Sequence, residues 1–432
     1  MPPSNSLPIL AAALRSGELS LTGYLDQLMA HFNEREPEVL AFVPEKNRFQ
    51  RLTQEAQVLL QKYPNVGQRP SLFGVPIGVK DIFHVKGFET QAGSRLPTRI
   101  LQGDEAASVT GLRRAGALIL GKTVTTEFAY FAPGPTRNPH NPAHTPGGSS
   151  SGSAAAVAAG LSPLTLGTQT IGSINRPAAF CGVVGYKPSY DRISRVGVIP
   201  LAGSLDHIGG FTTDVAGMQM VAALLCADWD PTLAAPTHRP VLGIPAGPYL
   251  ERASATALTH FSQVCARLRE TGFTLVDVPT MADFDEIYAR HNLIVAAEAA
   301  RTHRDWFREH RALYHEKTRD LIERGQQISK EQLTVALAGR SQLRSQLTDL
   351  MFAHGLDGWL SPPAMGPAPA GLESTGDPVM NLPWTHSGLP TVTLPAGKDA
   401  AGLPLGLQLT GHWYADEELL GFAAQIEKVL GF

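Results

Sequence analysis

Two serine-rich segments and one lysine carry the residue types needed for nucleophilic hydrolysis. Residues 146–153 are Pro-Gly-Gly-Ser-Ser-Ser-Gly-Ser, and residues 167–173 are Gly-Thr-Gln-Thr-Ile-Gly-Ser. Lys80 lies within the glycine-punctuated, apolar strand pattern of residues 73–83, where a surface lysine is least expected. A serine hydroxyl attacks a carbonyl well only when a neighbour takes its proton, and lysine can do so as the neutral amine that burial favours.

The segment 146–153 has other interpretations. A flexible Gly/Ser linker would be flanked by polar sequence, whereas this segment runs directly into the small apolar residues 154–160. An anion-binding helix N-terminus stays open, but a Walker A loop would need a lysine where Ser153 stands. Residues 148–152 also match Gly-x-Ser-x-Gly, which would make Ser150 the nucleophile, yet no strand pattern precedes them as that motif requires.

The sequence between the two serine-rich segments predicts that they meet in space. It has room for a helix of about 10 residues, about 15 Å long, and a returning strand of about 6 residues, about 20 Å long. The chain therefore runs out and back, and we expect Ser149 and Ser173 at one end of a sheet. Residues 138–175 include no charged side chain, so the region also provides the dry surroundings that lower a lysine pKa.

These segments together resemble the amidase signature family. The resemblance rests on Gly-Gly-Ser-Ser-Ser-Gly-Ser-Ala-Ala-Ala-Val at 147–157 and Gly-Thr-Gln-Thr-Ile-Gly-Ser-Ile-Asn-Arg-Pro-Ala-Ala-Phe at 167–180. It extends to Lys80, to Ser-Leu-Asp at 204–206 and to Gly-Leu-Pro-Leu-Gly-Leu-Gln at 402–408, and so covers nearly the whole chain.

The resemblance implies a catalytic Ser-Ser-Lys triad. Ser173 falls on the family's nucleophile, Ser149 on its bridging serine, held by a cis peptide bond after Gly148, and Lys80 on its base. In that scheme Ser149 relays a proton to the leaving amine. Asp206 we interpret as a hydrogen-bond acceptor that holds its loop rather than as a catalytic acid.

The chain departs from the family pattern just before the nucleophile. Many members have Asp-Thr-Gly-Gly-Ser where residues 169–173 are Gln-Thr-Ile-Gly-Ser, so Ile171 replaces a glycine. The resemblance implies an oxyanion hole made by the backbone N–H groups of Thr170, Ile171 and Gly172, each worth about 3–4 kcal/mol by analogy with acyl-transfer enzymes. A β-branched residue restricts the backbone more than glycine does, so the donor geometry at Ile171 stays open.

A second departure concerns an arginine. The family's common arginine stands two residues after the nucleophile, but here Asn175 takes that place and Arg176 follows it. The arrangement resembles small-amide hydrolases of the malonamidase type, which act on carboxylate-bearing amides. Arg176 would then bind a substrate carboxylate, and the alternative is a structural ion pair with an acidic residue in the core.

Aromatic residues complete the expected site. We assign Tyr130 and Trp384 to substrate binding. Trp384 and His386 lie in a second run without charges, residues 378–397, and could line the acyl pocket or equally belong to the core.

The sequence gives no indication of a metal or another cofactor. His140 and His144 lie in a loop rich in Pro and Asn, without helical ligand spacing and a third ligand. Cys181, Cys226 and Cys265 are isolated from one another, which argues against a disulfide framework and favours a reducing, cytoplasmic location.

Charge and hydropathy exclude several classes of partner. The 36 basic and 39 acidic residues nearly balance, so no strong field would gather nucleic acid or an anionic membrane. The apolar run 7–14 has no basic residue before it and predicts the start of an amphipathic helix rather than a signal peptide. We expect a small-molecule amide as the ligand, no nucleic acid and no membrane. The oligomeric state, with a homodimer as one option, stays open.

The apolar patterns that must position these groups indicate an α/β fold. Helical spacing predicts two or three helices in residues 1–65 and further helices at 256–270, 282–323 and 332–353. Short apolar runs predict strands at 73–82, 117–120, 163–166, 241–244, 358–361, 391–395 and 405–409. The resemblance implies a mixed, mostly parallel sheet of about eleven strands surrounded by helices.

We expect one large domain over residues 1–432, since no low-complexity linker or internal repeat divides the chain. Its parts would be N-terminal helices at 1–65, a catalytic core at 73–215, a helical excursion at 253–355, and C-terminal strands and a helix at 356–432.

The function predicted from these observations is hydrolysis of a linear small-molecule amide through an acyl-enzyme, with release of ammonia or an amine. Carbamates and ureas belong to the same range of substrates. Two enzymatic alternatives are the glutamine-hydrolysing subunit of a tRNA-dependent amidotransferase and an α/β-hydrolase-type esterase that uses Ser150. A scaffold that kept the fold without catalysis is disfavoured, because all three triad positions are intact.

Overall fold

A mixed β-sheet runs through the centre of the molecule, which is a computed structural model that describes residues 6–432. In this part of the chain ten strands follow the order β2-β1-β3-β5-β4-β9-β10-β8-β6-β7. The strands are β1 (Pro76–Lys80), β2 (Leu118–Thr123), β3 (Leu164–Gln169), β4 (Val184–Lys187), β5 (His207–Thr212), β6 (Val241–Ala246), β7 (Thr274–Pro279), β8 (Gly358–Ser361), β9 (Thr391–Lys398) and β10 (Pro404–Gly411).

The α/β class and the mixed sheet are confirmed, but the sheet is not mostly parallel. Among the described strands four pairings are parallel and five are antiparallel. The antiparallel pairings occupy the middle of the sheet, where β9 and β10 follow each other through a short turn and need no crossover helix. The ten strands are one fewer than the resemblance implied.

Three strands have no counterpart among the predicted runs. β4 is only four residues long, and β5 carries two consecutive glycines, Gly209 and Gly210, which weaken a strand pattern. β7 lies at the edge of the sheet, and most of its residues are partly or fully exposed. The predicted helical excursion, 253–355, therefore contains one strand.

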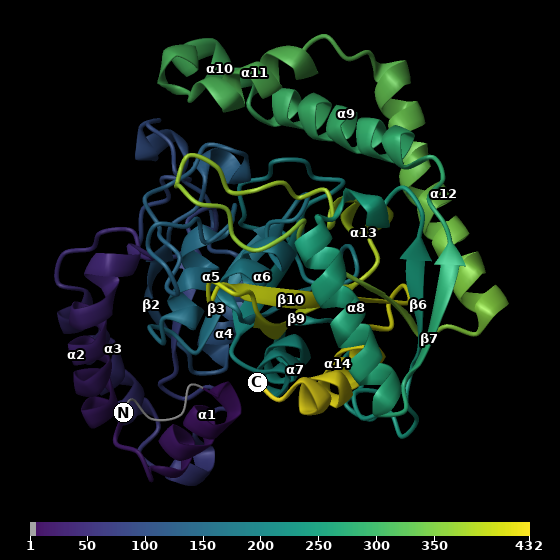
Figure 1. Cartoon of the computed structure of the whole chain (residues 1–432). Coiled ribbons are helices and arrows are strands. Elements are labelled where there is room, and N and C mark those ends of the chain that lie inside the picture. Colours follow the sequence, from purple (N-terminus) through teal and green to yellow (C-terminus); the bar gives the residue numbers. More distant parts are fainter. Residues whose placement is uncertain (1–5) are drawn as a thin grey trace.

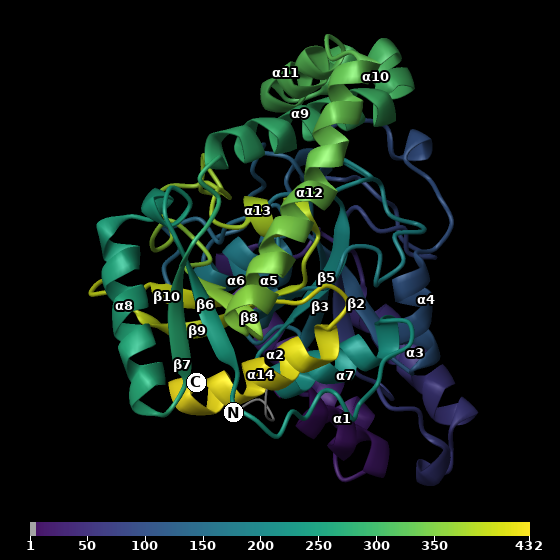
Figure 2. The ribbon, with the colours of Figure 1, turned by 90° about the vertical axis from the view of Figure 1, so that its right-hand side faces the viewer.

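Helices surround this sheet (Figure 1). Both views place α5 and α6 on one side of β9 and β10 and α7 and α14 on the other (Figures 1 and 2). The helices are α1 (Leu7–Ser16), α2 (Leu21–Val39), α3 (Arg48–Lys62), α4 (Ala107–Arg114), α5 (Ser151–Ala158), α6 (Asn175–Cys181), α7 (Val215–Leu225), α8 (Ala255–Glu270), α9 (Phe284–Thr302), α10 (Arg304–His310), α11 (Glu316–Gly325), α12 (Lys330–His354), α13 (Leu382–Ser387) and α14 (Asp416–Leu430).

The N-terminal prediction is confirmed by α1, α2 and α3; residues 1–5 of the predicted segment lie outside the described residues. The apolar run 7–14 forms most of α1, with its leucines buried. Among residues 6–432, none of the helices has both the length and the apolar character needed to cross a bilayer.

Helices α9, α10 and α11, residues 284–325, form a cap above one end of the sheet, and α12 returns from it along the side of the molecule (Figures 1 and 2). The sequence predicted helical structure over residues 282–323, and in the structure breaks near His303 and at residues 311–315 divide this segment into three helices. The break after α10 lets Tyr314 pack against Phe128 of the catalytic core, with ring centroids 5.5 Å apart. The cap is therefore anchored to the core by aromatic contacts.

Strand pairing positions the segments that are predicted to be catalytic. β1 pairs in parallel with β3, and the register of Val79 opposite Leu166 places Lys80 beside the end of β3. β5 runs antiparallel to β3, with His207 opposite Gln169, so Asp206 lies next to the loop that follows β3. Parallel strands end at the same edge of a sheet, and this edge carries the site.

The small residues of α5 let this helix lie very close to the sheet. Every residue from Ser151 to Val157 is buried. At Gly152 an added Cβ would collide with the Ala41 carbonyl and the Val124 amide, so only glycine fits there. This close approach explains why a helix of alanines, serines and glycine follows Ser149.

Candidate active site

Lys80 is the last residue of β1, and its side chain is completely buried. Its Nζ donates hydrogen bonds to Ser149 Oγ and Thr168 Oγ1, each over 2.7 Å. Burial lowers the pKa of Lys80 well below its ordinary value, while the Asp206 carboxyl acts in the opposite direction. A buried amine of this kind can accept a proton from a hydroxyl.

Ser149 and Ser150 are neighbours with different partners. Ser149 follows a cis peptide bond at Gly148, and its hydroxyl accepts the hydrogen bond from Lys80. The fully buried Ser150 hydroxyl donates to the Thr168 carbonyl over 3.1 Å and accepts from the Thr168 amide over 3.3 Å. Ser150 therefore joins the start of α5 to β3, which disfavours the esterase in which it would be the nucleophile.

Ser173 lies two residues before α6 and is almost buried. Its hydroxyl makes no hydrogen bond to the residues that the structure describes. The side chain of Arg176, in the first turn of α6, donates to the Gly148 carbonyl over 2.7 Å. This bond ties the segment after Ser173 to the residue that precedes Ser149.

The loop of Thr170, Ile171 and Gly172 is held by polar contacts on both flanks. Thr170 Oγ1 donates to Asp206 over 2.6 Å, and the Ile171 carbonyl accepts from Thr385 Oγ1 of α13, also over 2.6 Å. All these side chains are buried. We call residues 170–172, which are predicted to form the oxyanion hole, the oxyanion loop from here on.

Gln169, just before the oxyanion loop, forms hydrogen bonds to the residues that follow Ser173 and to α13. Its Oε1 accepts the backbone amides of Ile174 and Asn175 over 2.8 and 2.9 Å, and its Nε2 donates to Thr385 Oγ1 over 2.9 Å. Where many family members have aspartate, this longer amide therefore reaches both the start of α6 and α13.

The backbone conformation explains why isoleucine is tolerated at position 171. Ile171 does not have a positive φ, so a β-branched residue fits its backbone. Gly172 is different, because a Cβ there would collide with Asn381 Oδ1 and press on Pro378. Of positions 171 and 172, only 171 has room for a side chain, and this is the position where isoleucine replaces the family's glycine.

Asp206 acts as the hydrogen-bond acceptor predicted from the sequence. Besides Thr170, it accepts the amides of Leu201 and Ala202 over 2.9–3.2 Å. Burial raises its pKa to about 6, and these hydrogen bonds act against that rise. The carboxyl links the oxyanion loop to the segment before β5.

Arg176 is buried without an ion pair. Its Nη2 donates to Gly148 and, over 3.1 Å, to Thr375 Oγ1, while Nε and Nη1 have no hydrogen-bond partner among the described residues. No carboxylate lies within 4.0 Å of it in that part of the chain. Burial lowers its pKa to about 10, and the nearby Asp377 opposes this. The alternative of a structural ion pair is therefore wrong, and the guanidinium keeps unused donors.

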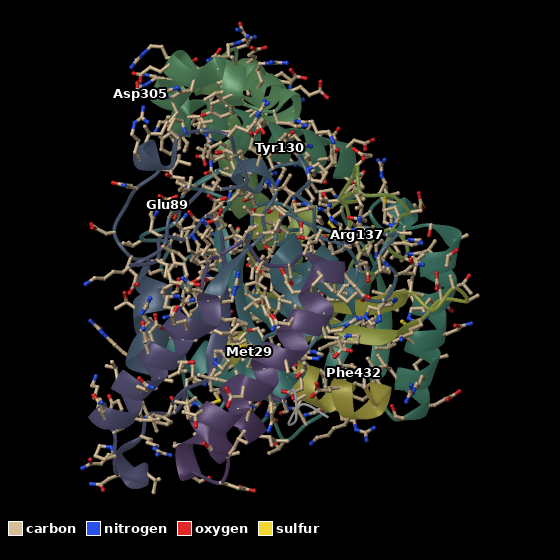
Figure 3. All side chains as sticks on the ribbon, turned by 90° about the vertical axis from the view of Figure 1, so that its left-hand side faces the viewer. Met29, Glu89, Tyr130, Arg137, Asp305 and Phe432 are labelled. Carbon is tan, nitrogen blue, oxygen red and sulfur yellow. The ribbon has the colours of Figure 1, made fainter. Side chains whose placement is uncertain are left out.

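Tyr130 lies at a cavity of about 740 Å³ between the core and the cap. Its hydroxyl accepts from Arg324 of α11 over 3.3 Å, and Figure 3 shows it close to the cap helices. Phe131, Lys317 and Thr375 line the same cavity. Because Thr375 also bonds to Arg176, this opening lies next to the buried guanidinium.

Trp384 does not face this opening. It is completely buried in the apolar cluster under the cap, and its Nε1 donates to Tyr249 Oη over 2.9 Å. The assignment of Trp384 to substrate binding is corrected: it belongs to the core. Its neighbour His386 is also completely buried and packs near His291, with ring centroids 5.5 Å apart.

The histidines of the Pro/Asn-rich loop have structural partners. His140 Nε2 donates to the Cys181 carbonyl over 2.9 Å, and His144 Nδ1 donates to the Ala368 carbonyl over 2.8 Å. In residues 6–432 no group of three His, Cys, Asp or Glu side chains has an arrangement that could hold a metal ion.

Two threonines that contact the site were not predicted from the sequence. Thr168 binds Lys80, and its place inside the motif 167–173 was the available signal. Thr385 lies in the uncharged run 378–397, where the larger rings of Trp384 and His386 are more conspicuous.

Comparison with known proteins tests the resemblance to the amidase signature family. The model of the amidase family matches residues 44–420. A curated relative from Geobacter metallireducens, a subunit of glutamyl-tRNA(Gln) amidotransferase, is 32% identical over 84% of each chain. A solved structure described as an amidase, 30% identical, superimposes with a TM-score of 0.89 over 99% of this chain and 100% of its own.

The native peptide amidase of Stenotrophomonas maltophilia is 25% identical and has a TM-score of 0.81, over 99% of this chain and 97% of its own. The finer likeness to malonamidase-type enzymes is not tested by these matches and stays a prediction. The family match over most of the length, together with the fold neighbours, shows that this chain belongs to the amidase signature family.

Proposed function

We propose that this protein hydrolyses a small-molecule amide through an acyl-enzyme on Ser173. The observation that carries the proposal is the buried hydrogen bond, 2.7 Å long, from Lys80 Nζ to Ser149 Oγ, in a site where burial favours the neutral amine. The family, whose model is named for amidases, supports the reaction class.

The proposed reaction begins when Ser173 Oγ attacks the amide carbonyl. Its proton passes to Ser149, which gives its own proton to the Lys80 amine. The oxyanion accepts hydrogen bonds from the backbone of the oxyanion loop, and Ser149 protonates the leaving nitrogen as the C–N bond breaks. Water then hydrolyses the acyl-enzyme by the same proton path and releases the acid.

Arg176 is the proposed determinant of a carboxylate on the substrate. A carboxylate would accept a hydrogen bond from Nη1 or from Nε, the two guanidinium nitrogens that have no partner among the described residues. The loop 374–377, which borders both Arg176 and the cavity at Tyr130, would have to admit that group. Arg176→Ala should then lose carboxylate-bearing amides selectively, whereas equal loss of all substrates would contradict the assignment.

The test of the function is release of ammonia or amine from a panel of linear amides, carbamates and ureas, with and without a carboxylate. The Ser173→Ala variant is the matched control. Activity of the wild-type protein that disappears in this variant supports the proposal, and equal activity of the two proteins would refute it.

A second candidate is the glutamine-hydrolysing component of a tRNA-dependent amidotransferase. The curated relative from a glutamyl-tRNA(Gln) amidotransferase favours it, at 32% identity. For the same reason, our expectation that nucleic acid has no part is not supported. The position of Arg176, one residue later than the family's common arginine, counts against the amidotransferase candidate. Stable co-purification with a second chain, together with glutamine-dependent ammonia release, would favour this candidate over the free amidase.

The cytoplasmic location and a homodimeric state stay predictions. Analytical ultracentrifugation of the purified protein would measure its oligomeric state directly.

A further inference from the structure

Ile171 of the oxyanion loop lines a cavity of about 300 Å³, which adjoins the cavity at Tyr130 because Phe131 and Ser374 line both. The opposite walls come from the cap helix α9 and from the short helix α13. Ile171 shares this cavity with Phe131, Tyr288, Asn292, Leu382, Ser374 and residues 376–378. Its side chain is almost buried and belongs to the apolar cluster under the cap. The residue that replaces the family's glycine thus forms a wall two positions from Ser173.

The backbone of the oxyanion loop is held by contacts that do not involve the Ile171 side chain. Thr385 binds the Ile171 carbonyl, Thr170 binds Asp206, and Gly172 packs against Asn381. A shorter side chain at position 171 therefore enlarges the cavity while the loop keeps its anchors. Since Ile171 has no positive φ, valine or alanine can adopt the same backbone.

The direction of the cavity indicates which half of the substrate enters it. In the proposed reaction the leaving nitrogen lies against Ser149, which protonates it. Ser149, its partners Lys80 and Thr168, and the nucleophile Ser173 do not line this cavity, and Ile171 is the residue of the oxyanion loop that borders it. The acyl group, on the other side of the carbonyl, is the part that extends toward Ile171.

We propose that Ile171 determines specificity by restricting the acyl group to a short, unbranched chain. This inference rests on the proposed amidase function. A β-branched side chain has little freedom at χ1, so Ile171 provides a stiff wall. Gly376 and Asp377 of the same cavity lie near Arg176, which does not itself line the cavity.

The experiment compares wild-type protein with Ile171→Val and Ile171→Ala on two substrate series. The first series keeps ammonia as the leaving group and enlarges the acyl part, from succinamic acid to its 2-methyl and 2-phenyl derivatives and from propionamide to 3-phenylpropionamide. The second keeps the succinyl group and enlarges the amine from ammonia to methylamine to benzylamine.

The ratio of kcat/KM for large over small acyl groups should rise about tenfold in Ile171→Ala and by less in Ile171→Val. The amine series should keep its wild-type ratios. Unchanged acyl ratios in active variants, or an equal rise in both series, would overturn the role of Ile171 alone. Failure of the wild-type protein to hydrolyse any amide would overturn the proposed function and this inference with it.

Ile294→Val is the matched control. Ile294 is completely buried on α9 and belongs to the same apolar cluster, but it does not line the cavity. This variant loses the same methylene group from the core as Ile171→Val, so its acyl ratio should stay at the wild-type value. A rise there as well would assign the effect to general loosening of the core and overturn the proposal.

Discussion

Two regions of the molecule differ in their charged side chains: the edge of the sheet where the predicted triad lies, and the cap above that edge. Residues 138–175 include no Asp, Glu, Lys or Arg, and the groups around Lys80 are buried and bonded to one another. The cap carries exposed ion pairs, such as those of Arg308 with Asp305 and of Arg311 with Glu323. The buried surroundings at the sheet edge can shift the pKa of Lys80, whereas water screens the exposed charges of the cap.

This contrast predicts different consequences of mutation. An exposed ion pair contributes about 0–1 kcal/mol to stability, whereas a buried polar group left without its partner costs about 1–3 kcal/mol. Substitutions at the sheet edge should therefore change the chemical step, and substitutions at the cap should change substrate access and local stability.

The largest effect is expected for Ser173→Ala. Loss of the nucleophile should lower kcat by about 10⁴-fold or more, since the remaining groups have no acyl acceptor. The free energy of unfolding should change by less than about 1 kcal/mol, because the hydroxyl has no hydrogen-bond partner among the described residues. Kinetics and urea unfolding measure the two quantities.

Fluorophosphonate labelling sharpens this prediction. The probe should modify Ser173 in the wild-type protein and in Ser150→Ala, and it should fail on Ser173→Ala. Ser150→Ala should instead be destabilised, since it loses two hydrogen bonds to Thr168. An adduct on Ser150 in peptide mapping would restore the esterase hypothesis.

Lys80→Met should lower kcat by about 10²–10⁴-fold, the range for loss of a general base. Wild-type activity should rise with pH through the lowered pKa of Lys80, because only the neutral amine accepts a proton. The variant should lose this rise. A pH–rate profile with the same rising limb in both proteins would show that another group is the base.

Lys80 also predicts a sign for stability against pH. Between the lowered pKa of the folded protein and the ordinary value of 10.5, the unfolded chain binds one proton more than the native state. The free energy of unfolding should therefore gain a positive contribution to its slope as pH rises through this interval. Lys80→Met removes that contribution, which denaturant titrations at several pH values would measure.

A smaller effect is expected for Thr385→Val, which removes the hydroxyl that binds the Ile171 carbonyl. The oxyanion loop should lose alignment, and kcat should fall about tenfold with KM nearly unchanged. Thr385→Ser keeps the hydroxyl and should restore most of the rate. An equal loss in both variants would assign the effect to packing of α13.

The smallest effect is expected at the cap. Both carboxylate oxygens of Glu127 accept the His315 amide just before α11, over 3.0 and 3.1 Å. Glu127→Gln should weaken the attachment of α11 by about 1 kcal/mol. Hydrogen exchange in residues 316–325 should accelerate and KM should rise while kcat holds. A fall in kcat without faster hydrogen exchange would contradict the prediction that substitutions at the cap leave the chemical step unchanged.

Local sequence patterns were sufficient to predict many of the helices and strands and to select Lys80, Ser149 and Ser173 as candidate site residues. The amphipathic spacing of residues 7–14 and 256–270 predicted α1 and α8, because burial of one helix face is a local property of the sequence. Lys80 was recognised because a charge inside an apolar strand is costly unless it has a use. The short spacing from Ser149 to Ser173 left room for one helix and one strand only.

Other features depended on contacts between distant segments. Thr385 reaches Ile171 across 214 residues, and Arg176 reaches Thr375 across 199. No pattern near Trp384 distinguishes a pocket wall from a core residue, since both environments favour an aromatic ring. β7 was missed because an exposed edge strand has little apolar periodicity.

The sequence by itself therefore determined which residues could perform the chemistry and many of the segments that form helices or strands, because side-chain type and periodicity are local. Only the tertiary structure decided the hydrogen-bond partners of Lys80, the absence of an ion pair at Arg176 among the described residues, and the cavity beside Ile171. Those features arise where elements far apart in the chain pack together, and packing selects partners by shape and burial rather than by neighbourhood in sequence.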